Sequence, residues 1–205
     1  MKNTEKFDEL YRDVEHITLY LEKKQETLDK IIQITRNIIR DSGHTITLIH
    51  NDEIFKAEEL IKKINEEVNA LKNIDNEFKY NTIQAYQEYV EALSFLSIIK
   101  TNKLPMMKDL NVSDEAYLLG IMDVVGELKR KIIELLRTEK VGEAKEMLSI
   151  MEAIYDSTRK LKFAESVLQG FRKKQDVARI QIESASSQLL FFENTKFIDV
   201  DNTEH

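Results

Sequence analysis

Residues that end helices or form tight turns are scarce in this sequence. Among its 205 residues there are five glycines and one proline. Folds made of short strands need more of both, because glycine and proline supply the backbone angles of tight turns. Hydrophobic residues make up 42% of the chain, so a chain of this length can bury a sizeable core. The sequence therefore predicts a single all-α domain built from long helices with few breaks.

Apolar residues at helical spacing locate the expected helices. The predicted segments are 5–41, from Asn51 or Asp52 to about Leu71, 77–101, 113–137, 141–162 and 165–192. Ser42-Gly43 is expected to stop or kink the first helix, and Thr45–His50 is interpreted as further helix. Ser113 is expected to cap the helix that follows it. Residues 1–192 then form one domain, and 193–205 form a polar, disordered tail.

The composition excludes several classes of protein. There is no cysteine, which excludes disulfide frameworks, thiolate zinc sites and cysteine nucleophiles. The first ten residues lack the apolar core of a signal peptide, and the most apolar run, 93–100, is shorter than the roughly 20 residues that span a bilayer. We therefore expect a cytoplasmic protein with no membrane partner. The net charge of −7 argues against a nucleic-acid coat protein, but screening over about 10 Å leaves a local basic groove open.

Four carboxylates lie in two predicted helices that are otherwise almost entirely apolar. In 85–99 the only charged residues are Glu88 and Glu91, and in 116–128 they are Asp123 and Glu127. A helix that is apolar nearly all round is expected to be buried, and the i, i+3 and i, i+4 spacings put each pair on one helix face. Buried carboxylates need a partner or a proton. We call these four residues the acidic quartet.

A divalent cation between the two helices would reconcile two buried acidic pairs. Its ligands would be hard oxygens, which favour Mg²⁺, Mn²⁺ or Ca²⁺, and the chain lacks the Glu-x-x-His motif of di-iron bundles. Spacing alone favours a structural explanation, because acidic pairs at i, i+3 or i, i+4 arise often on solvated helix faces, and it is the apolar surroundings that support a metal site. The main structural alternative is a buried network in which the acids pair with arginine. Arg130, three residues after Glu127, is the candidate partner in that network, and it is also a candidate phosphate ligand.

The same two segments resemble the signature helices of the translin/Trax family, with Trax as the nearer match. YQEYVEALSF at 86–95 contains Glu-x-x-Glu, and YLLGIMDVVGELKR at 117–130 contains Asp-x-x-x-Glu in an LLG-x-x-D-x-x-GE context. More weakly, TITLIHND at 45–52 resembles the end of the family's first helix, and GFRKKQDVARIQIESASSQLL at 170–190 resembles its last helix.

The resemblance implies both a fold and an activity. It implies a translin-type bundle of about seven helices that assembles into a closed homo-oligomer, often an octamer, around nucleic acid. It also implies a divalent-metal-dependent endoribonuclease that cleaves single-stranded or short RNA, with single-stranded DNA as a further candidate substrate. Glu88, Glu91, Asp123 and Glu127 would then bind Mg²⁺, or Mn²⁺, and carry catalysis. The alternative is a non-catalytic single-stranded nucleic-acid-binding protein of the translin kind, which lacks the quartet.

Basic and histidine side chains supply candidate contacts to nucleic acid. Arg36 and Arg40, one turn apart on the first helix, and Arg130 are candidate phosphate ligands. Further basic residues cluster at Arg159, Lys160, Lys162, Arg172, Lys173, Lys174 and Arg179. An ordinary solvated helix face explains any one of them as well. His44 and His50 are candidates for contacting RNA or for moving protons, with capping or packing as the alternative.

Overall fold

The chain is all-helical in its computed structural model, which describes residues 7–74 and 78–201, with side chains up to residue 194. These residues form six α-helices and one turn of 3₁₀ helix, with no strand among them. The elements are α1 (Asp8–His50), α2 (Ile54–Ile74), α3 (Lys79–Thr101), η2 (Met107–Asp109), α4 (Asp114–Arg137), α5 (Val141–Thr158) and α6 (Phe171–Asp201). The predicted all-α class is confirmed.

The first helix runs through Ser42-Gly43 without ending, so of the stop or kink predicted there, the stop is wrong. Thr45–His50 is helical, as expected. A glycine in a helix interior costs about 1 kcal/mol, but packing on α2 and α3 outweighs that cost. Ile38 and Ile49, on either side of the glycine, are both fully buried. The helix ends at His50, and Asp52 follows in the left-handed region with a φ of 59°.

Three other helix boundaries also differ from the prediction. α5 ends at Thr158 and α6 begins at Phe171, because a loop that includes Gly170 in the left-handed region, with a φ of 76°, separates them. α6 then continues to Asp201, beyond the predicted helix end at 192. Residues 171–201 contain no glycine or proline that would end a helix. The last four residues of the predicted tail lie outside the described part of the chain.

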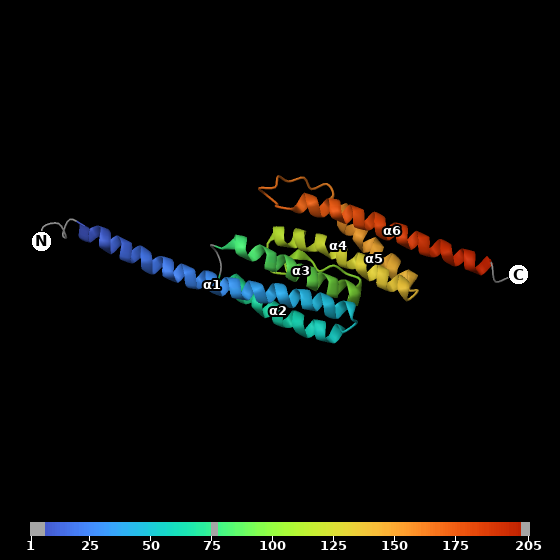
Figure 1. Ribbon diagram of the computed structural model, residues 1–205, viewed down its shortest axis with the longest axis horizontal. Helices are drawn as coiled ribbons and strands as arrows, with labels where there is room; N and C mark the ends of the chain where they lie inside the picture. The colour runs from blue at the N-terminus through green and yellow to red at the C-terminus, as the bar shows by residue number, and fades with distance from the viewer. Residues whose placement is uncertain (1–6, 75–77, 202–205) are drawn as a thin grey trace.

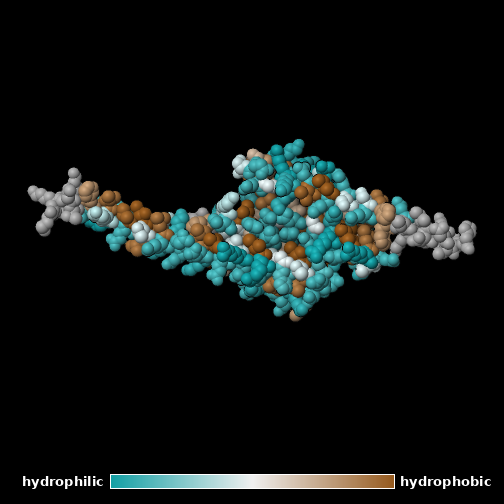
Figure 2. All heavy atoms as spheres, viewed as in Figure 1, coloured by the Kyte–Doolittle hydropathy of each residue, from teal (hydrophilic) through white to brown (hydrophobic). Residues whose placement is uncertain are grey.

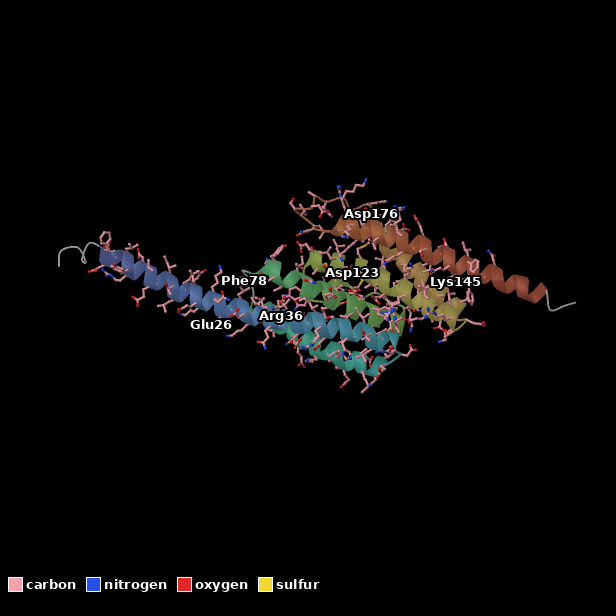
Figure 3. The ribbon with its side chains drawn as sticks, in the orientation of Figure 1. Glu26, Arg36, Phe78, Asp123, Lys145 and Asp176 are labelled. Carbon is pink, nitrogen blue, oxygen red and sulfur yellow. The ribbon has the colours of Figure 1, made fainter. Side chains whose placement is uncertain are left out.

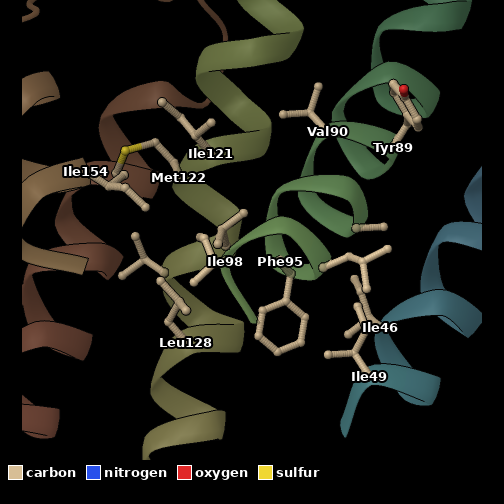
Figure 4. Close-up of a cluster of buried hydrophobic side chains, with 14 of the residues drawn as sticks. Ile46, Ile49, Tyr89, Val90, Phe95, Ile98, Ile121, Met122, Leu128 and Ile154 are labelled. Carbon is tan, nitrogen blue, oxygen red and sulfur yellow. The ribbon is translucent and has the colours of Figure 1, made fainter. Parts of the chain in front are cut away.

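The helices form an elongated bundle with α3 and α4 at its centre (Figure 1). α1 packs against α2 and α3, and α4 packs against α3, α5 and α6. Phe95 and Ile98 of α3, Leu128 of α4 and Ile49 of α1 meet in the core, and all four are fully buried (Figure 4). The two helices that carry the acidic quartet are therefore the central pair of the bundle.

Close packing brings α3 and α4 together beside the quartet. Gly120 of α4 lies so near α3 that an added Cβ would be 2.6 Å from the Cβ of Val90 and 2.7 Å from the backbone oxygen of Gln87. Such distances leave no room for any side chain, so glycine is required here. Ser113 caps α4 as predicted, since its hydroxyl accepts a hydrogen bond from the amide of Ala116 at 3.2 Å. Both features fix the position of Asp123, one turn beyond Gly120.

The N-terminal part of α1 extends out of the bundle at one end, and α6 extends beyond it at the other (Figure 1). Every described residue from Phe7 to Lys23 is exposed. Several of them have large side chains: Leu10, Tyr11, Val14, Ile17 and Leu21. Figure 2 shows hydrophobic residues in a band along this protruding part of the molecule. None of the helices over 7–74 and 78–201 is long and apolar enough to cross a membrane.

Candidate functional site

Asp123 lies in the middle of α4 and is held by side chains of two other helices. The ammonium group of Lys174, near the start of α6, donates to one carboxylate oxygen of Asp123. The Nε2 of Gln87 on α3 donates to the other at 2.7 Å. Figure 3 shows Asp123 near the centre of the bundle. Its side chain is 23% exposed and that of Lys174 is 26% exposed, so this ion pair is half-buried.

Glu127, one turn further along α4, is tied to the end of α1. Its Oε2 lies 2.6 Å from Nε2 of His50, whose side chain is 2% exposed. The other ring nitrogen of His50 lies 2.8 Å from Oε1 of Glu134, although this contact lacks hydrogen-bond geometry. The ring also packs against Phe95, with centroids 5.0 Å apart. His50 is therefore a buried group placed between two carboxylates.

The surroundings of the two acids of α3, Glu88 and Glu91, differ from those of the two acids of α4. Burial raises the pKa of Glu91 to about 9, and the charges of Asp123, Glu88 and Glu127 add to that rise. Burial also raises the pKa of Glu88, with a further contribution from Asp123. Over 7–74 and 78–194, neither carboxylate has a hydrogen bond or an ion pair. The structure therefore brings the other three predicted acids within electrostatic reach of Glu91.

The donor set of the quartet matches a hard divalent cation in its chemistry. It offers only carboxylate oxygens, and burial together with the neighbouring carboxylates raises the pKa of Glu91 to about 9, so a cation there would stabilise its charged form. In their present rotamers the side chains do not converge, since no group of three or more acidic or histidine residues over the described ranges is arranged to hold a metal ion. Lys174 supplies the nearest positive charge instead.

The three predicted arginine contacts fall in two places. Arg130 is 58% exposed, and its Nη1 lies 3.9 Å from Glu127, so it is close to the quartet but is a looser partner than His50. Arg40 donates to Asp41 at 2.7 Å, and Asp41 also binds Lys63 of α2. Arg36, exposed on α1 (Figure 3), and Arg40 are thus not brought together with the quartet.

Three residues of this site could not be assigned to it from sequence. Gln87 gives no signal of its own, because an uncharged amide beside a glutamate is unremarkable in a helix. Lys174 was one of seven clustered basic residues, and nothing in its spacing points to Asp123, 51 positions away. His50 was a general candidate only. Contacts between distant helices determine all three assignments.

Comparisons with known proteins agree with this fold. The family model described as the Translin family matches residues 6–185. An uncharacterized protein of Methanocaldococcus jannaschii is 29% identical over 189 residues, which are 90% of this chain and 85% of that protein. The Translin-associated protein X homolog of Schizosaccharomyces pombe is 28% identical over 134 residues, covering 56% of this chain and 58% of the relative. This chain thus spans less than two thirds of that relative.

Solved structures agree as well. A complex of AfC3PO with duplex RNA is similar with a TM-score of 0.84 and 30% sequence identity, covering 90% of this chain and 98% of that one. Apo-NeC3PO has a TM-score of 0.80 at 23% identity, which supports the fold alone. The family model covers most of the chain, and the helices it matches include both that carry the acidic quartet. The chain therefore belongs to the Translin family.

Proposed function

We propose that this chain is a divalent-metal-dependent endoribonuclease that cleaves single-stranded or short RNA. The observation that carries the proposal is the crowding of three further carboxylates around Glu91, whose pKa is raised to about 9. A structural network would normally balance such acids with fixed cations. Here a single lysine opposes the rise in the pKa of Glu91, so the quartet favours one more positive charge.

The quartet would hold Mg²⁺, or Mn²⁺ in its place, through Glu88, Glu91, Asp123 and Glu127. Such an ion would supply an activated water and stabilise the negative charge that develops on the phosphate. Gln87 and His50 are positioning residues, because each orients one carboxylate of α4 through a contact of 2.6–2.7 Å. Lys174 balances charge at Asp123 without metal, and its ammonium is placed to bind a phosphate oxygen once displaced.

RNA as the substrate is supported by relatives. A similar protein, AfC3PO, has been solved with duplex RNA. The chain is also similar to relatives named Translin-associated protein X. We also propose a closed homo-oligomer, an octamer by family resemblance, because the protruding part of α1 exposes a row of large apolar side chains that needs cover. Light scattering should then give several times 24.0 kDa, whereas a stable monomer at micromolar concentration would contradict it.

A second candidate function is nucleic-acid binding without catalysis, as in translin. One observation favours it: Asp123 and Glu127 have partners in Lys174 and His50. A structural network would look the same on α4. A structural network does not explain why Glu88 and Glu91 on α3 have no cation partner among the described residues. Catalysis is therefore the better-supported proposal.

Incubation of labelled single-stranded RNA with the pure protein separates the two candidates. The nuclease proposal expects cleavage with Mg²⁺ and none with EDTA. RNA that is bound with a steep salt dependence but stays intact in Mg²⁺ and Mn²⁺ would favour the binding protein. Absence of both cleavage and salt-sensitive binding would contradict both.

A further inference from the structure

A cavity of about 970 Å³ lies next to the acidic quartet. Its walls come from the end of α2, the first half of α3, the start of α4 and the loop over 165–169. Pockets that bury small ligands span about 300–1,000 Å³, so this one is large enough for a nucleotide-sized group. The acidic quartet itself does not line it, and the proposed chemistry leaves the cavity without a role.

The walls of the cavity suit a neutral planar ring better than a phosphate. Two lysines and two glutamates line it, Lys72 and Lys79 against Glu115 and Glu165, so its formal charges cancel. The remaining walls mix apolar, aromatic and amide side chains: Ile83, Leu119, Tyr80, Tyr86, Gln84 and Asn111. Nucleobases bind to such surfaces by stacking and by hydrogen bonds along their edges. Phosphates instead need clustered cations.

One side chain links the cavity to the quartet. Gln87 lines the cavity, and its Nε2 donates to Asp123 at 2.7 Å. The loop over 165–169 closes another wall and leads directly into α6, which carries Lys174 to the same aspartate. A group in the cavity is therefore adjacent to the carboxylates that would act on RNA.

We propose that the cavity binds one unstacked nucleobase of an RNA strand and thereby places a neighbouring phosphate at the acidic quartet. The second half of this inference rests on the proposed nuclease function, whereas the base site does not. A paired base must leave its duplex to enter, at an energetic cost that a single strand avoids. The cavity thus selects single-stranded over paired RNA.

The chain contains no tryptophan, so one introduced tryptophan reports on the cavity alone. Tyr80→Trp places it in the cavity wall, at a residue that is 82% exposed. Adenosine 5′-monophosphate, added to this variant in EDTA, should change its fluorescence with saturation. Tyr11→Trp, at a 65% exposed tyrosine on the protruding part of α1, is the matched control and should not respond. Absence of a saturable response at Tyr80→Trp would overturn the base site.

A filling substitution tests the cavity itself. Ser166→Phe, in the Tyr80→Trp background, adds a ring at an exposed position of the cavity wall and should weaken nucleotide binding about tenfold or more. Ala164→Phe is the matched control, since Ala164 is exposed in the same loop and does not line the cavity. Equal affinity in the two variants would overturn the proposal. Ribose 5-phosphate lacks the base and should not bind; binding as tight as the nucleotide's would reassign the cavity to phosphate.

Cleavage distinguishes this inference from the proposed function. Ser166→Phe should lower kcat/KM for single-stranded RNA about tenfold, with an unchanged melting temperature, while Ala164→Phe keeps the wild-type value. Loss of nucleotide binding without loss of cleavage would overturn the link to the substrate. Nucleotide binding in a protein that never cleaves RNA would overturn the nuclease proposal and leave the base site standing.

Discussion

The two central helices hold their carboxylates in opposite ways. On α4, Asp123 binds Lys174 and Gln87, and Glu127 binds His50. On α3, Glu91 has a pKa raised to about 9 by burial and by its acidic neighbours. Half of the quartet is therefore paired, whereas the two acids of α3 have no cation partner among the described residues, and Glu91 keeps its proton near neutral pH. The contrast indicates that contacts of α4 orient the carboxylates of the site, whereas the buried acids of α3 would gain most from a bound cation.

The largest expected effect is loss of cleavage when a charge is removed from either helix. Glu91→Gln and Asp123→Asn keep the side-chain shapes and remove an oxygen ligand, so kcat should fall by about 10²–10³ or more. Single-turnover cleavage of labelled RNA at saturating Mg²⁺ measures it. Glu143→Gln, at an exposed carboxylate of α5, is the matched control and should keep the wild-type rate. A wild-type rate in Asp123→Asn would remove this residue from catalysis.

The next effect is a pH dependence of stability that comes from α3. The pKa of Glu91 rises on folding from 4.5 to about 9, so between these pH values the folded protein binds more protons than the unfolded chain. The contribution of Glu91 to the free energy of unfolding should therefore be greatest at and below about pH 4.5. It should then fall as the pH rises to 9, by at most about 1.4 kcal/mol per pH unit. Urea unfolding over this range, in EDTA, measures the slope.

Two variants make that measurement a test of the comparison. Glu91→Gln should flatten the slope and raise metal-free stability at high pH. Asp123→Asn should instead lower it by about 1–2 kcal/mol, because the half-buried Lys174 loses its partner. Shifts in the same direction would mean that the two helices do not differ in the way described. Mg²⁺ should raise the melting temperature of the wild type more than that of either variant.

A smaller effect concerns the distance between the two helices. Gly120→Ala would put a Cβ 2.7 Å from the backbone oxygen of Gln87, so we expect a loss of about 1–3 kcal/mol as α3 and α4 separate. Gly43→Ala is the matched control in α1, where an added Cβ meets nothing within 4 Å, and it should stabilise the helix by about 0.5–1 kcal/mol. Thermal unfolding compares the two. Equal effects would show that the close approach at Gly120 is unimportant.

The smallest effect separates the arginine near the quartet from those on α1. Arg130→Ala should weaken RNA binding a few-fold and reduce the slope of log affinity against log salt by about 1, as expected for one lost phosphate contact. Arg40→Ala should change neither, because Arg40 is paired with Asp41 away from the quartet. Filter binding over a salt series is sufficient. A larger loss in Arg40→Ala would place the RNA on the α1–α2 face.

Much of the fold and half of the site followed from spacing along the sequence. The scarcity of helix breakers predicted the all-α class, and two apolar helices with isolated acids predicted the quartet and its shared faces. The partners of those acids did not follow, since they depend on how distant helices are aligned. Lys174 reaches Asp123 only because α6 packs on α4 in one register.

The error at Ser42-Gly43 shows why local signals can fail. A glycine after a serine indicates a helix end when only neighbouring residues are considered. Burial of Ile38 and Ile49 in the bundle keeps α1 helical through that point. The continuous helix is also what carries His50 to Glu127. A helix that ended at the predicted position would have left this carboxylate without its closest partner.

The protruding part of α1 has a consequence for how the chain folds. From Phe7 to Lys23 every residue is exposed, so this stretch receives no support from the core. A helix of that length is marginal in water by itself. Its amide protons should therefore exchange with solvent far faster than those around Ile38 and Ile49, although both stretches belong to one continuous helix. We therefore expect α1 to contain two cooperative units, of which the outer reaches the stability of the inner only when another surface covers it. In the proposed homo-oligomer that surface is a second copy of the chain, so folding of the outer unit should depend on protein concentration.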